Sequence, residues 1–409
     1  MKCRHCQAQV TLPFIDLGTA PPSNAYLTRE QLAAPETWYP LRVFTCTHCW
    51  LVQTEDYAHH AALFSGDYAY FSSYSSSWLA HAEHYVDAMA ERLRLGAASH
   101  VVEIAANDGY LLQYVKARGI ACLGIEPTAG TAQAARDKGI AIREAFFGVA
   151  LADALVAEGL AADLMVANNV LAHVPDINDF TAGFARLLKP QGVATFEFPH
   201  LMRLVEQCQF DTIYHEHFSY LSLTAVQRIF AANGLVVFDV EELPTHGGSL
   251  RVFAQRADTG GQRADQRVHA MLEREALAGM KAPAFYQGFQ AAADRVKNDF
   301  HAFLIDAKRQ GKQVAAYGAA AKGSTLMNYA GIRPDLLAYV VDRSPAKQGR
   351  YMPGSRIPIV DESRIDETRP DYVVILPWNL KAEVMQQLAR IRQWGGKFVT
   401  AVPHLEVLP

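Results

Sequence analysis

Segment 210–220 places two imidazoles, two carboxylates and two phenols between apolar residues. A proton acceptor in such surroundings lies in a partly dry pocket, with polar neighbours that tune its pKa. An extended segment would put His215 and His217 on one face and Tyr214 and Glu216 on the other, whereas a loop would not keep this separation. The alternative is a buried sheet edge whose histidines only satisfy hydrogen bonds. So many titratable groups within a few residues favour proton-transfer chemistry.

Two Cys-x-x-Cys pairs, Cys3 with Cys6 and Cys46 with Cys49, are the second feature that could do chemistry. Each pair can place two thiolates on one turn, and two such turns complete the closed tetrahedral site of structural zinc. The proline-rich stretch between the pairs has little regular structure of its own, so zinc is expected to supply much of its folding energy. Free or redox-active thiols are the alternative. A four-thiolate site has no open coordination position, so we expect zinc to take no part in catalysis.

Length and composition limit the remaining possibilities. The chain has 409 residues, which predicts two or three domains, and 50% of the residues are hydrophobic, as in a soluble globular protein. A formal net charge of -4 offers no electrostatic footprint for nucleic acid or an anionic membrane. No signal peptide or apolar run of the ~20 residues that span a bilayer is evident. We therefore expect a cytoplasmic protein that binds neither nucleic acid nor membrane.

The middle of the chain, from His100 to Phe238, alternates apolar strands with helices, as a Rossmann-like α/β domain does. Its first strand, 101–104, leads into the turn 107–109, whose backbone amides can approach a ligand at a helix N-terminus. The second strand, 121–125, ends at Glu126, where such folds hold ribose hydroxyls with an acid. No G-x-G-x-x-G motif follows the first strand, which favours S-adenosylmethionine over a dinucleotide. An antiparallel hairpin is expected to close the sheet, as is common in methyltransferases.

A second strand-turn-helix pattern begins after a charged helical region at 258–308. Strands are expected at 312–318, 337–342, 372–376 and 397–401, which predicts a second Rossmann-like domain. Its first turn, with Lys322, would suit a pyrophosphate, and Asp342 at the end of its second strand would suit a ribose. A degenerate domain that only packs against the first is the alternative.

These features occur together with several short motifs in one order along the chain. The motifs are the two cysteine pairs, Tyr68 to Ser76, Val102 to Gly109, Gly124 to Pro127, Asn169 to Pro175, Phe210 to Tyr220 and His246 to Arg251. In this order the chain resembles, over nearly its whole length, the nucleotide-sugar C-methyltransferases of bacterial deoxysugar biosynthesis. The resemblance implies an α/β protein: a zinc-binding domain (1–68), a class I S-adenosylmethionine methyltransferase domain (69–257) and a Rossmann-like C-terminal domain (258–409). It also implies methylation beside the ketone of a dTDP-4-keto-deoxysugar, most commonly at C-3.

Carried over by motif, the resemblance makes His217 the catalytic base, with Tyr214 and Glu216 beside it and Tyr68 and His173 near the sugar. The residues expected to bind the cofactor are Glu103, Asn107, Asp108, Gly109, Glu126, Pro127, Asn168 and Asn169. Those expected to bind the substrate are Tyr70, Ser73, His246, Ser249, Arg251, Tyr317, Gly318, Lys322, Gly323, Asp342, Trp378 and Asn379. One departure is Ala105-Ala106, where many members have Gly-Ser. It bears on cofactor binding because glycine tolerates unusual φ angles better than alanine does.

The chemistry follows from the residue types as well. A carbon beside a ketone becomes nucleophilic when its proton is removed and the enolate is stabilised. Neutral His217 could take the proton, while phenols or a second imidazole donate to the oxyanion. The alternatives are an NAD(P)-dependent oxidoreductase of nucleotide sugars and a zinc-ribbon adaptor with a degenerate methyltransferase domain. A metal site at His215, Glu216 and His217 would lack the helical spacing of zinc hydrolases. We expect a monomer or a weak homo-oligomer.

Overall fold

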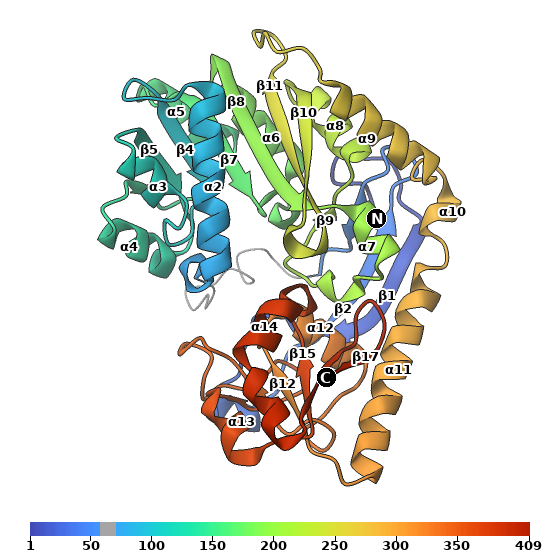
Figure 1. The fold of residues 1–409 in the computed structure, drawn as a ribbon. Helices are drawn as coiled ribbons and strands as arrows, with labels where there is room; N and C mark the ends of the chain where they lie inside the picture. Colours follow the sequence, from blue (N-terminus) through green and yellow to red (C-terminus); the bar gives the residue numbers. More distant parts are fainter. Residues whose placement is uncertain (58–70) are drawn as a thin grey trace.

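The computed structural model describes residues 1–57 and 71–409, so Tyr68 and Tyr70 lie outside the described residues. Within these ranges the chain forms three β-sheets, of four, seven and six strands. The seven-stranded sheet occupies the upper part of Figure 1 and the six-stranded sheet the lower part, with helix α11 (Phe289–Arg309) running along the side. No helix in these described ranges is both long and apolar enough to cross a membrane.

The seven-stranded sheet has the order β10-β11-β8-β7-β4-β5-β6. Neighbours among β4 to β8 pair in parallel, whereas β11 is antiparallel to both β8 and β10. A parallel sheet closed by an antiparallel hairpin is the arrangement that the sequence predicted. The strands are β4 (His100–Ile104), β5 (Ala121–Ile125), β6 (Ile142–Arg143), β7 (Ala162–Asn168), β8 (Leu188–Pro199), β10 (Leu235–Leu243) and β11 (Ser249–Arg256).

Helices cover both faces of this sheet because its central strands are apolar on both sides. On β7, for example, Leu164 and Val166 join one apolar cluster, while Met165 and Ala167 join the cluster on the opposite face. Helix α8 begins as predicted, with the Ser222 hydroxyl capping it. The helices are α2 (Ser76–Leu93), α3 (Leu112–Ala117), α4 (Ala129–Asp137), α5 (Val149–Ala157), α6 (Ile177–Leu187), α7 (Leu201–Glu206), α8 (Leu223–Ala232) and α9 (Gln266–Leu277).

The N-terminal sheet has the order β1-β2-β3-β9, and its fourth strand comes from the middle of the chain. Strand β9 (Ser219–Tyr220) is the end of segment 210–220, and it pairs antiparallel with β3 (Val52–Thr54). The N-terminal part therefore holds the predicted catalytic segment by backbone pairing. The other two strands of this sheet are β1 (Leu12–Ala20) and β2 (Tyr39–Thr45).

The C-terminal sheet has the order β14-β13-β12-β15-β16-β17, in which only β17 is antiparallel among these strands. This is the second Rossmann-like domain that the sequence predicted. One apolar core joins it to β1, where the Phe14 ring stacks on Phe289 at 4.5 Å. The strands are β12 (Val314–Tyr317), β13 (Val340–Val341), β14 (Ile359–Val360), β15 (Tyr372–Ile375), β16 (Lys397–Thr400) and β17 (Glu406–Leu408). The helices besides α11 are α10 (Pro283–Tyr286), α12 (Ala321–Tyr329), α13 (Ser363–Thr368) and α14 (Lys381–Gln387).

Candidate active site and zinc centre

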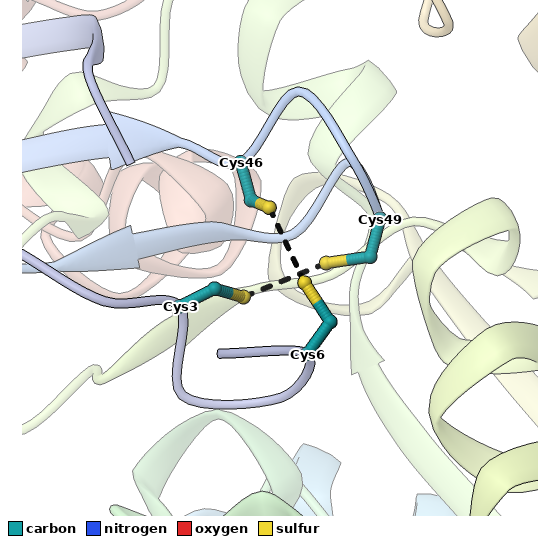
Figure 2. A group of neighbouring side chains, drawn as sticks. All are labelled: Cys3, Cys6, Cys46 and Cys49. Atoms are coloured by element: carbon teal, nitrogen blue, oxygen red, sulfur yellow. Dashed lines mark hydrogen bonds between the residues drawn. The ribbon is translucent and has the colours of Figure 1, made fainter. Parts of the chain in front are cut away.

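The four predicted zinc ligands converge at the edge of the N-terminal sheet. Figure 2 shows the Sγ atoms pointing at one another, with Cys3 and Cys49 3.5 Å apart and Cys6 and Cys46 3.6 Å apart. All four ligand atoms lie within 4.8 Å of one another. Four Zn–S bonds of about 2.3 Å in a tetrahedron require sulfur atoms about 3.8 Å apart. The donor set and its spacing therefore fit a closed structural zinc site.

Each cysteine pair stands on a tight backbone turn, and the two turns have the same hydrogen bond. Gln7 donates its N–H to the carbonyl of Cys3, and Trp50 does the same to Cys46, at 3.0 and 2.8 Å. Both Gln7 and Trp50 have positive φ angles, of 59° and 65°, which close the turns tightly. The Gln53 side chain donates to the Cys3 sulfur at 3.3 Å, so strand β3 adds a hydrogen bond to the thiolate cluster.

The same N-terminal strand reaches the predicted catalytic segment. Thr54 donates through its N–H to the carbonyl of Phe218 at 3.2 Å and through Oγ1 to the carbonyl of His217 at 3.1 Å. Arg4, next to the first zinc ligand, donates to the carbonyls of Thr54 and Pro175. A short chain of hydrogen bonds thus connects the zinc turn with the backbone of His217.

Segment 210–220 is a loop rather than a strand over most of its length. It starts with a 3-10 helix (Phe210–Thr212) and becomes extended only at β9. The separation of faces expected for an extended segment therefore does not apply. His215 instead faces the N-terminal sheet, where its Nε2 donates to the Pro40 carbonyl at 3.2 Å and its ring lies edge-on to Tyr39. This placement separates His215 from His217.

His217 is buried, with 9% of its surface exposed. Its Nδ1 lies 2.8 Å from the Thr212 carbonyl, which can only accept a hydrogen bond, so Nδ1 carries the proton and Nε2 carries the lone pair. None of the hydrogen bonds described for residues 1–57 and 71–409 uses this Nε2. Burial, and then the neighbouring His173, lower the pKa of His217 well below its ordinary value. A neutral imidazole with a free lone pair is suited to accept a proton.

His173 lies against His217, with ring centroids 4.5 Å apart and the rings at 65°. It ends a 3-10 helix (Leu171–His173), and its Nδ1 donates to the Glu216 carbonyl at 2.8 Å. Burial lowers the pKa of His173 to about 4. The Tyr214 ring also lies against His217, with ring centroids 4.0 Å apart. The structure thus brings together three of the five predicted catalytic residues at one point.

The Glu216 carboxyl is buried and accepts a hydrogen bond from the Asn24 amide at 3.2 Å. Its Oε2 has no partner in the part of the chain that the structure describes, and burial raises its pKa. Asn24 was not predicted as a site residue, because it lies in the proline-rich stretch that shows no periodic pattern. Next to it, the Tyr26 hydroxyl donates to the Ala319 carbonyl at 2.6 Å. This N-terminal stretch therefore contacts both the catalytic segment and the C-terminal domain.

Residues 105–109, here the cofactor turn, follow β4 and have an unusual backbone. Ala105, Asn107 and Gly109 have φ angles of 55°, 51° and 75°. Glycine suits position 109, because φ is 75° there and a Cβ would lie 3.2 Å from the Ala135 Cβ. Glu126 accepts the N–H of Asn107 at 2.9 Å and that of Thr128, and so fixes the turn from the tip of β5. Of the alanine pair that departs from the family pattern, Ala105 has the positive φ that glycine would adopt more readily.

Several buried polar atoms beside this turn lack a partner within the described ranges. They include Glu103 Oε2, Asp108 Oδ1 and both amide atoms of Asn168, at the carboxyl ends of β4 and β7 or just beyond. A buried polar atom left without a hydrogen bond costs about 1–3 kcal/mol. These atoms therefore fit a polar ligand such as the cofactor that the sequence predicted. Ser73 also contacts this turn, because its N–H donates to the Asp108 carboxylate at 3.3 Å. Pro127 follows Glu126 in the chain.

Residues predicted from the 246–251 motif divide into two groups. His246 lies at the carboxyl end of β7, where the Asn169 amide donates to its Nε2 at 3.2 Å. Ser249 and Arg251 are instead engaged within the protein. The Ser249 hydroxyl donates to a backbone carbonyl, and the buried Arg251 guanidinium pairs with Glu197 at 3.2 Å and with Glu241.

In the C-terminal domain, as at the cofactor turn, an acidic side chain after the second strand accepts backbone N–H groups. Asp342 accepts the N–H groups of Ala319 and Ser344, each at 2.8 Å, as Glu126 does in the first domain. Gly318 and Gly323 allow close packing, since a Cβ at either would lie under 3 Å from Pro377 or Leu376. The Tyr317 hydroxyl bonds to Gln387 inside the domain at 3.2 Å.

The last predicted group, Lys322, Trp378 and Asn379, faces the catalytic segment. Lys322 donates to the Asn379 side chain at 2.6 Å, and its Nζ lies 4.7 Å from the centre of the Trp378 ring. The Trp378 indole N–H donates to Asp211 of the catalytic segment at 2.8 Å. Asp211 was not among the predicted site residues, although it stands in the same segment.

Three family models match consecutive parts of the chain: a putative zinc binding domain over residues 3–64, a methyltransferase domain over 78–240 and a C-methyltransferase C-terminal domain over 244–403. With the strand order and the four-cysteine site, these matches define a methyltransferase that uses S-adenosylmethionine and has a zinc-binding N-terminal domain. Over 407 residues the chain is 33% identical to the C-methyltransferase NovU of Streptomyces niveus, a match that covers 100% of this chain and 96% of NovU. The chain therefore belongs to the C-methyltransferase family.

Solved structures resemble only part of the chain. The PH0226 protein from Pyrococcus horikoshii has a TM-score of 0.37 and 12% identity, covering 49% of this chain and 100% of that one. The magnesium protoporphyrin IX methyltransferase of Synechocystis has a TM-score of 0.32 and 14% identity, covering 44% and 81%. The fold assignment rests on the strand order and the family models instead.

Proposed function

We propose that this C-methyltransferase acts on a dTDP-4-keto-deoxysugar and methylates C-3, the ring carbon beside the ketone. The observation that carries the proposal is the state of His217. Its only ring proton is donated to a backbone carbonyl, and its Nε2 is an acceptor in a buried setting beside His173. A buried neutral base is the group that removal of a carbon-bound proton needs.

In the proposed reaction, His217 Nε2 takes the proton from C-3 as the electrons of the C–H bond move toward the ketone oxygen. The rings of Tyr214 and His173 lie against the base, and Glu216 precedes it in the chain. S-adenosylmethionine supplies an electrophilic methyl group on a sulfonium. The residues assigned to hold it are those of the cofactor turn with Glu103, Glu126 and Asn168. The buried polar atoms of Glu103, Asp108 and Asn168 that lack a partner among the described residues support this role.

The nucleotide is assigned to the C-terminal domain. Support comes from the turn after β12, where Asp342 orders the backbone as Glu126 does in the cofactor turn. The His217 loop contacts this domain directly, because the Thr325 hydroxyl donates to the Ile213 carbonyl at 2.8 Å. A sugar on the nucleotide could thus reach the base. Cytoplasmic location, absence of nucleic-acid binding and a monomeric or weakly oligomeric state stay predictions from the sequence.

The test is to incubate the protein with methyl-labelled S-adenosylmethionine and a panel of dTDP-4-keto sugars, including 3-amino and 3-hydroxy forms. The label should appear at C-3 of one of them, located by mass spectrometry and NMR. Label at another carbon would refute the assigned position. Transfer to none of the sugars, by a protein shown to bind the cofactor, would refute the substrate class.

A further inference from the structure

Lys322 has a setting that the pyrophosphate role does not explain. It stands in the first turn of α12, and the next turn of this helix is bound to the catalytic segment through Thr325 and the Ile213 carbonyl. The Lys322 side chain lies over the Trp378 ring, and Asn379 accepts one of its hydrogen bonds. Helix α12 thus directs an ammonium group toward the segment that carries His217.

Trp378 connects this lysine to both sides of the candidate site. Its indole N–H binds Asp211, four residues before His215. Its ring also packs on Gly247, where a Cβ would lie 2.4 Å from the indole, and Gly247 follows His246. Asp211 is fully buried, and its second oxygen has no partner in residues 1–57 or 71–409. The buried Asp211 carboxylate, on the catalytic segment, therefore interacts with the positive charge of Lys322.

The neutral histidines around the base have at most one ring proton each and no positive charge to offer an oxyanion. His173 gives its Nδ1 proton to the Glu216 carbonyl, which leaves Nε2 as an acceptor. His246 accepts from Asn169 at Nε2. Burial lowers the pKa of each to about 4, so neither ring gains a second proton near neutral pH. The positive charge of Lys322, by contrast, acts on both His217 and His246.

We propose that the Lys322 ammonium contacts the ketone oxygen of the substrate and stabilises the enolate, while Asp211 and Trp378 position that ammonium. The inference rests on the proposed function. As the C–H bond breaks, its proton goes to His217 Nε2 and its electron pair forms the enolate C=C bond. The carbonyl π electrons move onto oxygen, where the ammonium donates a hydrogen bond. When the enolate carbon bonds to the methyl group, the methyl–sulfonium bond would break, its electron pair would stay on sulfur and S-adenosylhomocysteine would leave. The carbonyl is then restored and no oxidant is needed.

A lysine at a turn could instead bind only the pyrophosphate, and the two roles predict different measurements. Deuterium uptake at C-3 of the keto sugar, followed by NMR in D2O with S-adenosylhomocysteine present, reports enolate formation without methyl transfer. Binding of dTDP, followed by calorimetry, reports the pyrophosphate contact. Both are measured for the full chain and for Lys322→Met. Lys297→Met is the matched control. Like Lys322, Lys297 lies over an aromatic ring, that of Tyr329 at 5.0 Å, but it stands on the outer helix α11.

Lys322→Met should slow deuterium uptake at saturating substrate by roughly 10²- to 10³-fold, the usual loss when one oxyanion donor is removed. Its affinity for dTDP should stay within about 2-fold of wild type. Unchanged uptake with weakened dTDP binding would overturn the inference and favour the pyrophosphate role. If Lys322→Met fails to fold, Lys322→Gln is measured instead; it removes the charge but keeps an N–H donor, so a smaller loss of deuterium uptake is expected. Wild-type protein that exchanges and methylates no sugar would instead refute the proposed function itself.

Asp211 is a positioning residue under this proposal, and its test uses pH. The titratable groups whose charges interact with that of Lys322 are Asp211, His217 and His246. Asp211→Asn removes the attraction that opposes deprotonation of Lys322, so the high-pH decline of deuterium uptake should move to lower pH. A merely structural role would lower the rate without moving that decline, and this result would overturn the assignment.

Discussion

His173 and His217 meet edge to face, 4.5 Å between ring centroids, and each donates its Nδ1 proton to a carbonyl of the loop 212–216. Two carbonyl acceptors thus fix both tautomers, with the basic nitrogen of each ring at Nε2. Because the two rings pack together in a buried site, a positive charge on His173 would make one on His217 unfavourable.

Replacing His217 with Asn should abolish methyl transfer while cofactor binding is retained. The Asn amide can still donate to the Thr212 carbonyl, but it offers no basic nitrogen at the Nε2 position. Loss of a general base costs about 10²- to 10⁴-fold in rate. Calorimetric titration with S-adenosylmethionine is the binding control. A rate like that of wild type would remove His217 as the base.

Stability should depend on pH through His173. The unfolded chain protonates this ring near its ordinary pKa of 6.5, whereas burial holds the folded pKa at about 4. The folded state binds fewer protons between these values, so the stability is complete above pH 6.5 and is lost as the pH falls toward 4.

Urea unfolding at about pH 7 and about pH 5 tests this linkage. Wild type should lose more unfolding free energy across this range than His173→Asn. Asp211 titrates in the opposite sense, since burial raises its pKa to about 6, so the comparison between the two proteins is the decisive one. Equal losses in both proteins would contradict the assignment to His173.

Ala105→Gly should stabilise the protein. A left-handed alanine costs about 1–2 kcal/mol, and part of the gain from glycine is offset by its greater freedom in the unfolded chain. We expect a net increase of roughly 0.5–1 kcal/mol in the free energy of unfolding. Ala106→Gly is the control, because Ala106 is buried without a positive φ and should lose stability. Destabilisation by Ala105→Gly would show that its backbone is not strained.

Loss of the zinc site should impair catalysis without preventing cofactor binding. Cys6→Ser removes one thiolate, and β3 then loses the metal-bound turn that orders Gln53 and Thr54 beside His217. We expect lower zinc content, faster amide hydrogen exchange at 217–220 and reduced methyl transfer, with S-adenosylmethionine still bound by the separate seven-stranded sheet. Cys122→Ser should change none of these. Unaltered exchange at 217–220 in a zinc-free variant would contradict the connection.

Much of the architecture was predictable because local pattern encodes it. Apolar strands, short helices and the Ser222 cap set out two Rossmann-like units, and the paired Cys-x-x-Cys turns predicted the zinc site. Family membership then supports the methyltransferase prediction over the oxidoreductase and adaptor alternatives. These features depend on residues near one another in the chain, or on a donor set that only one metal geometry suits well.

The tertiary structure decided the environment of each group. Sequence alone could not tell that β9 would pair with β3, that Asn24 would contact Glu216, or that Lys322 would lie over Trp378, whose indole binds Asp211. Side chains on loops have no periodicity, and their directions are fixed by partners far away in the chain. The sequence therefore determined which chemical groups the protein possesses, and long-range packing determined which of them meet, in which tautomer and with what pKa.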